Sequence, residues 1–145
     1  PELVFDQGIG DIFSARVAGN IINDELLGSI EFATKVAGSK LVVVLGHTKC
    51  GAVQGSCDNV ELGHITSLVK EIRPSVEAVT PEGETCSSKN LERVNQIAEH
   101  NVGRTIEAMR KNSDVLTDLE KDGAIDIVGA MYDVSTGKVD FMEMK

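Results

Sequence analysis

The stretch from Lys40 to Gly51, Lys-Leu-Val-Val-Val-Leu-Gly-His-Thr-Lys-Cys-Gly, decides the fold. Its first half is an unbroken apolar run rich in β-branched residues, which is typical of a parallel strand buried on both faces. Upstream, the apolar residues from Leu26 to Ala37 follow helical spacing, with Asn23 or Asp24 as the expected N-cap and Gly38 as the end. A helix followed by a buried strand is half of a βαβ unit, so this region predicts an α/β fold.

The segments on either side of this unit also show recognisable patterns. Residues 12–15 are expected to form a short strand, and a short helix is expected to begin at about Gly51. A further helix is predicted over 62–72, where Pro74 stops it, because proline lacks the N–H that a helix interior requires. The many Pro, Gly, Thr and Ser residues of 74–87 are typical of a loop.

The second half of the chain completes the pattern. Apolar residues at a spacing of three and four predict the longest helix over 91–109, and a short helix is expected over 115–121. Residues 125–132 are predicted to form a strand, followed by turn residues at 133–137 and a returning edge strand over 138–142. The whole chain, 1–145, is therefore expected to be one α/β domain with a central, mostly parallel sheet flanked by helices.

The composition excludes several classes of function. The chain has 14 basic and 23 acidic residues, a formal net charge of −9, and only 3% aromatic residues. Proteins that bind single-stranded nucleic acid need a positive groove and aromatic stacking platforms, so no nucleic-acid partner is expected. No apolar run approaches the length of a membrane span, so no membrane partner is expected either.

The three cysteines, Cys50, Cys57 and Cys86, are odd in number and widely spaced. Small secreted domains stabilised by disulfides usually have an even number of cysteines at close spacing. We therefore expect a protein of the reducing cytoplasm. Cys57 is expected to be a free thiol, and Cys86 is expected to be exposed in the loop.

His47 and Cys50 are the residues in which we expect the chemistry to lie. In open α/β sheets, ligands bind beyond the carboxyl ends of the strands, and these two side chains directly follow the most buried strand. Cys50 also precedes a predicted helix, whose unpaired N–H groups favour a thiolate. A thiolate and a neutral imidazole are both good zinc ligands. Two other interpretations stay open: a structural pair, or a nucleophilic pair in which Cys50 attacks and His47 acts as base.

No third zinc ligand can be identified from the spacing. Cys57 is seven residues beyond Cys50, about 10 Å along a continuous helix, which is too far for both sulfurs to bind one zinc ion. His64 is expected to cap a helix or lie at the surface, and His100 is expected to face solvent. Two ligands are therefore predicted and the third is not visible.

Several motifs, taken together, resemble the β-class carbonic anhydrases. The stretch from Leu41 to Ala52 resembles that family's motif His-x-x-Cys-Gly. Residues 16–20, Arg-Val-Ala-Gly-Asn, are similar to its Arg-Asn-Ala-Gly-Asn, with Val17 in place of Asn. Residues 129–139 resemble its final Gly-x-x-Tyr-Asp-x-x-Thr-Gly-x-Val, and residues 1–13 are similar to the stretch that follows its first motif. The order and separation of the motifs agree along essentially the whole chain.

The resemblance implies an enzyme that interconverts carbon dioxide and bicarbonate on zinc, a carbonate dehydratase. It implies that His47 and Cys50 are two of three protein ligands of the zinc ion. It also implies that Phe13 and Ala18 line a narrow apolar substrate pocket, and that the backbone N–H of Gly51 faces substrate. A homodimer or a tetramer is expected as the assembly.

One motif of the family has no match in the chain. The family's first motif, Cys-x-Asp-x-Arg, contains the remaining zinc ligand, and by the resemblance it would precede Pro1. The chain is therefore expected to be an N-terminally truncated domain, inactive by itself, from an intact protein that is active. No catalytic residue is assigned within 1–145. The alternative is a relative that retains the fold as a scaffold or binding domain and has lost catalysis.

Overall fold

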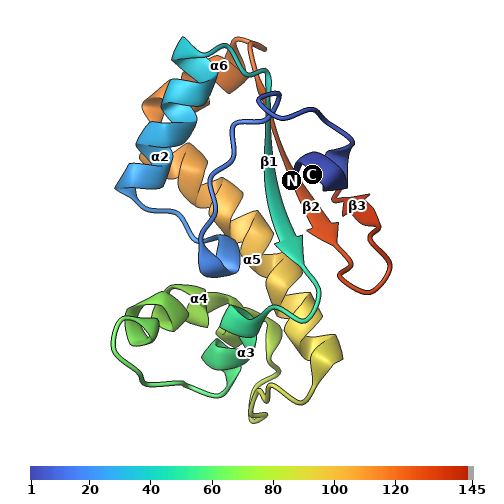
Figure 1. Cartoon of the computed structure of the whole chain (residues 1–145). Helices are drawn as coiled ribbons and strands as arrows, with labels where there is room; N and C mark the ends of the chain where they lie inside the picture. The colour runs from blue at the N-terminus through green and yellow to red at the C-terminus, as the bar shows by residue number, and fades with distance from the viewer. Residues whose placement is uncertain (144–145) are drawn as a thin grey trace.

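The computed structural model describes residues 1–143 of the chain, and these form a three-stranded sheet covered by helices (Figure 1). The strand order is β1 (Leu41–His47), β2 (Asp126–Tyr132) and β3 (Val139–Phe141). β1 and β2 are parallel, and β3 returns antiparallel to β2. The predicted α/β fold is thus confirmed. β1 lies at one edge of the described sheet, with a strand on one side only.

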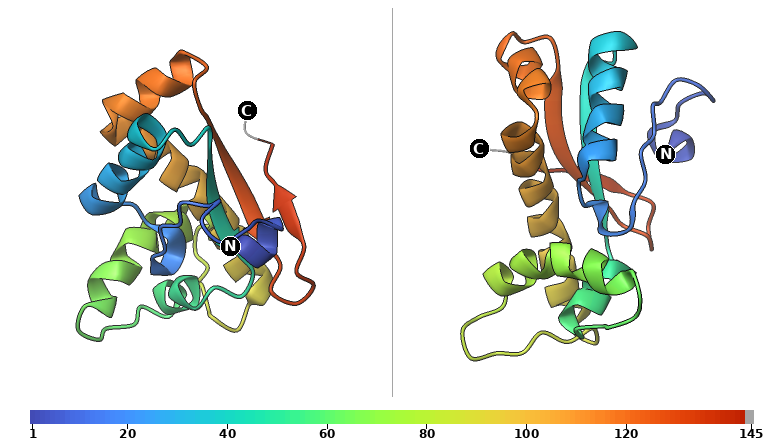
Figure 2. Two further views of the ribbon diagram at one scale, coloured as in Figure 1. Left: turned by 45° about the horizontal axis from the view of Figure 1, so that its top comes forward. Right: turned by 90° about the vertical axis from the view of Figure 1, so that its left-hand side faces the viewer.

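The helices surround the sheet unevenly. α5 packs against both β1 and β2, whereas α1 stands on the opposite side of the sheet (Figure 2, right). α3 and α4 pack together beyond the end of β1. The helical elements are α1 (Glu2–Phe5), η1 (Ala18–Asn20), α2 (Asp24–Glu31), η2 (Phe32–Val36), α3 (Gly51–Cys57), α4 (Ile65–Val79), α5 (Leu91–Asn112) and α6 (Asp114–Lys121). No helix among the described residues is both long and apolar enough to span a membrane.

The long helix α5 joins two hydrophobic cores. In its C-terminal half, Val102 and Ile106 pack in a core beneath the sheet that includes Val44 and Ile127. Near its N-terminal end it contributes to a second core between α3, α4 and α5, whose buried members are Cys50, Val53, Cys57, Ile72, Val76, Val94, Ile97 and Ala98. The predicted 3–4 spacing over 91–109 is what allows one helix to serve both cores.

Two elements differ from the sequence-based expectation. α4 does not stop before Pro74 but continues to Val79, so the loop comprises residues 80–90 rather than 74–87. Pro74 is exposed, and Ile72 and Val76 on the buried face of the helix are almost fully buried, so packing offsets the lost backbone hydrogen bond. The strand expected at 12–15 does not form, because among residues 1–143 no partner strand lies beside this segment.

Close packing of the sheet on α5 depends on two glycines in the strands. A Cβ atom at Gly46 would lie 2.6 Å from Met131 Sδ and 2.7 Å from Val102 Cγ2. A Cβ atom at Gly129 would lie 2.9 Å from Val102 Cγ1. The missing side chains let the helix approach the strands, and Gly46 directly precedes His47.

Gly46→Ala should destabilise the protein by about 1–3 kcal/mol, because the added methyl group overpacks the contact between β1 and α5. Gly103→Ala is the matched control. It lies in α5, where an added methyl group meets no described heavy atom within 4 Å, and it should stabilise by about 0.5 kcal/mol. Urea unfolding of both variants provides the measurement. Equal stability of the two variants would show that this close approach does not constrain the fold.

Candidate metal centre

His47 and Cys50 lie at the two ends of a tight turn between β1 and α3. His47 is the last residue of β1 and is half-buried. Cys50 is the N-cap residue of α3, and its side chain is only 4% exposed. It is the free cysteine of the described residues. The parallel strand and the short helix thus bring both predicted ligands to the carboxyl end of the sheet.

The hydrogen bond of the His47 ring determines which nitrogen can bind a metal. Nδ1 lies 2.9 Å from the carbonyl oxygen of Thr48. A carbonyl oxygen only accepts, so Nδ1 carries the proton and donates it. In the neutral ring, Nε2 then has a free lone pair, and a backbone carbonyl that binds the other nitrogen is one of the common partners of a metal-binding histidine.

The turn is attached to the end of β2 as well. The backbone N–H of Thr48 donates to the carbonyl oxygen of Tyr132 at 2.9 Å, which extends the parallel pairing by one residue. The hydroxyl oxygen of Thr48 accepts from the backbone N–H of Val134 at 3.1 Å. These bonds hold the residue after His47 against the neighbouring strand. The turn is therefore an extension of the sheet and not a free loop.

No third ligand lies near this turn within the described range. No group of three or more His, Cys, Asp or Glu side chains in residues 1–143 is placed to hold a metal ion. His64 begins α4 and His100 lies on α5, and both are exposed, as expected. An imidazole with a free lone pair and a thiol on one turn are nevertheless donor types that zinc prefers.

Cys57 and Cys86 form a disulfide bond, so the expectation that Cys57 is a free thiol is wrong. The bond joins the C-terminal end of α3 to the loop before α5. Asp58 supports the same junction, because its carboxylate accepts from the backbone N–H of Ser88 at 2.9 Å. Hydrogen bonds from the side chain and backbone of Ser88 lower the pKa of Asp58 from its ordinary value. The pairing could not be read from the sequence because 29 positions separate the two cysteines.

Of the three predicted pocket residues, the structure places Ala18 and Gly51 on elements that pack together. Gly51 is the first residue of α3, and η1, which contains Ala18, packs against that helix. A Cβ atom at Gly19 would lie 3.4 Å from the Cβ of Ala52, so the residues next to Ala18 and Gly51 are in contact. Phe13 is 51% exposed, and its ring packs on that of Phe32, with the centroids 6.4 Å apart.

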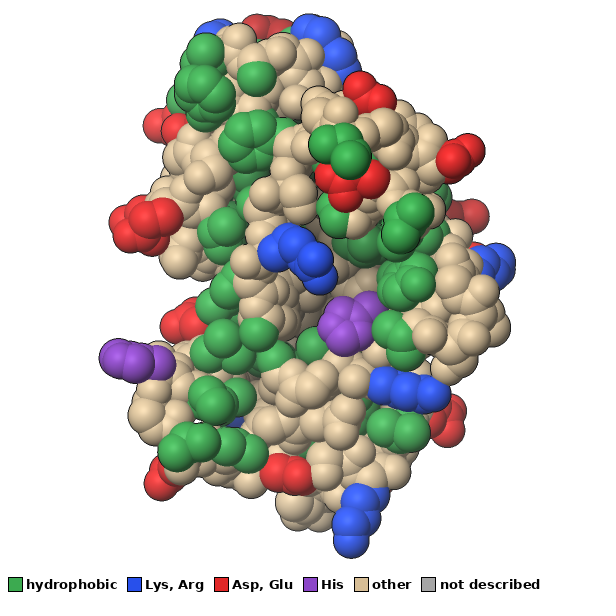
Figure 3. All heavy atoms as spheres, in the orientation of Figure 1, with side chains coloured by type: hydrophobic (Ala, Val, Ile, Leu, Met, Phe, Trp, Pro, Cys, Tyr) green, Lys and Arg blue, Asp and Glu red, His purple; other side chains and the backbone are tan. Residues whose placement is uncertain are grey.

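The molecular surface is hollowed near the middle of one face. In Figure 3, a histidine side chain and a basic side chain border this hollow, with hydrophobic side chains around them. Most acidic side chains on this face lie toward its rim. The strong negative charge of the chain is therefore not concentrated at the hollow.

Buried polar side chains of α4 and α5, which the sequence does not single out as functional, hold η1 in place. Asn101, 2% exposed, donates from Nδ2 to the carbonyl oxygen of Gly19 at 2.8 Å and accepts from the Ser75 hydroxyl at 3.1 Å. Thr105 donates to the carbonyl oxygen of Asn20 at 2.9 Å. The sequence does hold one signal for these contacts: Asn101 and Thr105 are polar residues at positions of the predicted helix where the spacing expects apolar ones.

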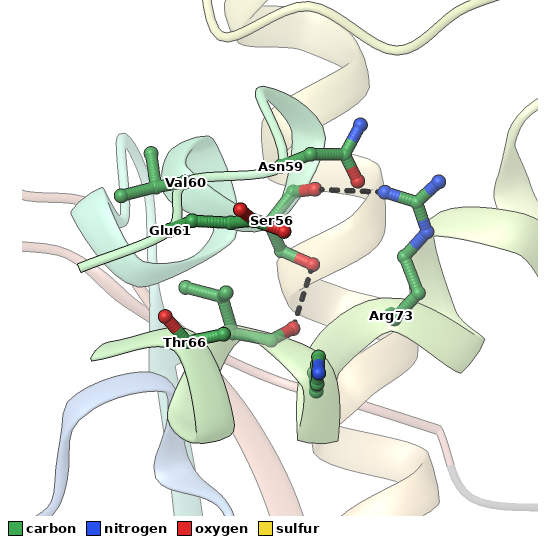
Figure 4. Close-up of a pocket in the computed structure, with 8 residues that line it drawn as sticks. Ser56, Asn59, Val60, Glu61, Thr66 and Arg73 are labelled. Atoms are coloured by element: carbon green, nitrogen blue, oxygen red, sulfur yellow. Dashed lines mark hydrogen bonds between the residues drawn. The ribbon is translucent and has the colours of Figure 1, made fainter. Parts of the chain in front are cut away.

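A cavity of about 200 Å³ separates parts of α3 and α4 (Figure 4), and neither His47 nor Cys50 borders it. The Ser56 hydroxyl donates to the carbonyl oxygen of Val69 at 2.9 Å, and Arg73 Nη1 donates to the carbonyl oxygen of Ser56 at 3.3 Å. These bonds join the two helices. They thereby support the helix that begins next to Cys50.

Comparisons with known proteins identify the family of the chain. The family model described as carbonic anhydrase matches residues 1–139. The chain belongs to the carbonic anhydrase family. It is 36% identical over 139 residues to a carbonic anhydrase of Mycolicibacterium smegmatis, covering 96% of this chain and 66% of the relative. It is 34% identical over 142 residues to carbonic anhydrase 2 of Mycobacterium tuberculosis, covering 94% and 65%.

Solved structures give the class of carbonic anhydrase. The crystal structure of the β-carbonic anhydrase CafA of Aspergillus fumigatus superposes with a TM-score of 0.87 at 29% identity, covering 98% of this chain and 68% of that one. The predicted resemblance to β-class carbonic anhydrases is confirmed. The chain spans just under two thirds of the length of the two mycobacterial carbonic anhydrases.

Reduction of the Cys57–Cys86 bond should lower the melting temperature, because the bond restricts the unfolded chain. For a loop of this size the expected loss is about 3.5 kcal/mol, which corresponds to roughly 10 °C. Thermal unfolding with and without a reductant provides the measurement. The double variant Cys57→Ser/Cys86→Ser is the control and should not respond to reductant. An equal response of both proteins would contradict the assignment.

Proposed function

We propose that this chain carries the zinc-binding core of an enzyme that reversibly hydrates carbon dioxide to bicarbonate and a proton. Membership of the carbonic anhydrase family supports this activity. The proposal rests on one observation: His47 and the free cysteine Cys50 lie on the same turn at the end of β1. The Nδ1 of His47 is already hydrogen-bonded to the carbonyl oxygen of Thr48, which leaves Nε2 available. That pair offers zinc one nitrogen and one sulfur ligand.

The chemical roles follow from the donor types. A zinc ion bound at this site would lower the pKa of water and so supply hydroxide near neutral pH. His47 would bind through Nε2, and the Thr48 carbonyl would keep that ring in the required tautomer. Cys50 would bind through Sγ. The N–H of Gly51 would donate to a substrate oxygen, and Ala18 and Phe13 would line the narrow apolar pocket.

Two protein ligands are fewer than the three of a typical catalytic zinc site. We propose that a residue outside the described range supplies the third, as expected from the family's first motif. Residues 1–145 alone would then lack a complete metal site. This accounts for both the retained pair and the lack of any three-residue cluster in the described part of the chain.

Substitution Cys50→Ser in the zinc-loaded intact protein should abolish stoichiometric zinc. A neutral hydroxyl is a much poorer zinc ligand than a thiolate. Metal analysis after gel filtration provides the measurement, with Cys57→Ser/Cys86→Ser as a control that should retain its zinc. If Cys50→Ser retained one zinc ion per chain, the ligand assignment would be incorrect.

The polypeptide 1–145 by itself should not hydrate carbon dioxide at an enzymatic rate. The reason is the missing third ligand, and a stopped-flow assay with a pH indicator measures the rate. The intact protein is the positive control. Rapid turnover by the 145-residue polypeptide would show that it contains or assembles a complete site.

Two alternatives predict different outcomes. A scaffold or binding domain would bind no zinc even as the intact protein. A thiol enzyme would be inactivated by iodoacetamide at Cys50 irrespective of chelators. The burial of Cys50 does not favour the latter, because a nucleophile must reach its substrate.

We propose a homo-oligomer, a dimer or tetramer, as the working assembly. No described strand pairs with the outer edge of β1, and the apolar side chains of Phe32, Val36 and Leu41 are exposed, so both features support a further contact.

The odd number of widely spaced cysteines predicts the cytoplasm as the compartment. The Cys57–Cys86 bond argues against it, because disulfides persist mainly in oxidising compartments.

A further inference from the structure

Lys49 occupies the position between the two proposed ligands and has an unusual backbone conformation. Its φ angle is 56°, in the left-handed region that residues with a Cβ atom rarely adopt. The residue directly precedes Cys50, so its dihedral angles determine where the thiol lies relative to the His47 ring. A conformation that is unfavourable by itself persists only where neighbouring contacts enforce it.

Three different segments hold the three polar groups of Lys49. Its backbone N–H donates to Asn95 Oδ1 of α5 at 2.8 Å. Its carbonyl oxygen accepts from Gln54 Nε2 of α3 at 2.9 Å. Its Nζ donates to the Ser135 hydroxyl, in the turn between β2 and β3, at 2.8 Å. The backbone N–H, the carbonyl oxygen and the Nζ of Lys49 are thus all hydrogen-bonded in the left-handed conformation.

These three contacts are not equivalent. Gln54 belongs to the helix that Cys50 begins, so it moves together with the thiol. Ser135 binds the end of a long, flexible side chain and leaves the backbone free to rotate. Asn95 alone links the backbone of Lys49 to an independent, rigid element: its neighbours Val94 and Ile97 are fully buried in the second core.

We propose that Asn95 is a positioning residue for the metal pair: its amide oxygen holds Lys49 in the left-handed conformation and thereby sets Cys50 relative to His47. The inference rests on the proposed function in assigning zinc to that pair. Asn95 is neither a proposed metal ligand nor a proposed pocket residue. On the other side of the turn, Thr48 is bonded to Tyr132, so the turn is fixed between β2 and α5.

Loss of the Asn95 contact has two consequences. Lys49 is released toward the ordinary negative-φ conformations, which shifts the backbone of Cys50. The two proposed ligands would then no longer be preorganised, and zinc would bind less tightly. Removal of residues that orient metal ligands weakens metal binding in the same way in other proteins. The buried thiol of Cys50 also becomes more accessible to reagents, with or without metal.

The test compares three variants of helix α5. Asn95→Leu retains the size of the side chain and removes the acceptor. Asn95→Asp retains an oxygen acceptor and should rescue. Gln96→Leu makes the same kind of change at the next, exposed residue and controls for the helix itself. Thermal unfolding shows whether each variant is folded, and Asn95→Ser, whose hydroxyl is too short to reach Lys49, replaces Asn95→Leu if that variant does not fold.

Three measurements apply to each variant. Hydrogen exchange of the Lys49 amide and the rate of Cys50 alkylation by iodoacetamide are measured without metal. Competition with a chromophoric chelator gives the zinc dissociation constant of the intact protein. For Asn95→Leu we expect faster amide exchange, faster alkylation and zinc binding weaker by about 10- to 100-fold. Asn95→Asp and Gln96→Leu should resemble the wild type.

Two results would overturn the inference. One is wild-type exchange and alkylation in folded Asn95→Leu. The other is faster exchange with an unchanged zinc dissociation constant, because Asn95 would then stabilise the turn without positioning the ligands. If the wild type itself bound no zinc, the proposed function would fail, and the exchange and alkylation rates would still decide whether Asn95 sets the turn.

Discussion

The structure depends on the close contact between helix α5 and the parallel strands β1 and β2. Val102 of this helix packs where Gly46 and Gly129 have no side chain, so the helix lies against the strand backbones. Once this contact is made, the N-terminal half of α5 projects beyond the end of the sheet. There it forms the second core, against which α3 and α4 pack. The position of the predicted ligands is therefore a consequence of helix-on-sheet packing.

α5 organises the candidate site although it provides no ligand. Its polar residues on the inward side each hold a backbone group of another segment: Asn95 holds the turn with His47 and Cys50, and Asn101 and Thr105 hold η1. A buried amide that makes two hydrogen bonds stabilises one backbone geometry and disfavours others, because an unpaired partner would be costly. The same helix is thus bonded both to the turn that carries the two proposed ligands and to η1 beside it.

Sequence patterns predicted the features that depend on local periodicity. β1 and β2 were recognised by their apolar, β-branched composition, α5 by its 3–4 spacing, and Asn23 was confirmed as the N-cap of α2 by its bond to Leu26. The errors concern tertiary context. Helix α4 continues past Pro74 because Ile72 and Val76 are buried. The Cys57–Cys86 bond and the hydrogen bond between Asn95 and Lys49 each join residues that are far apart in the sequence. No spacing rule contains that information.

The contacts around the turn also restrict where a further ligand can approach. On one side Thr48 is bonded to Tyr132 and Val134, and on another Lys49 is bonded to Asn95. β2 and α5 thus occupy two sides of the turn, while no strand among residues 1–143 pairs with the outer edge of β1. A strand edge with unpaired backbone groups readily accepts another strand. A segment that paired there would extend the sheet and bring its side chains to the end of β1, so its pairing would be coupled to metal binding by the proposed ligands His47 and Cys50.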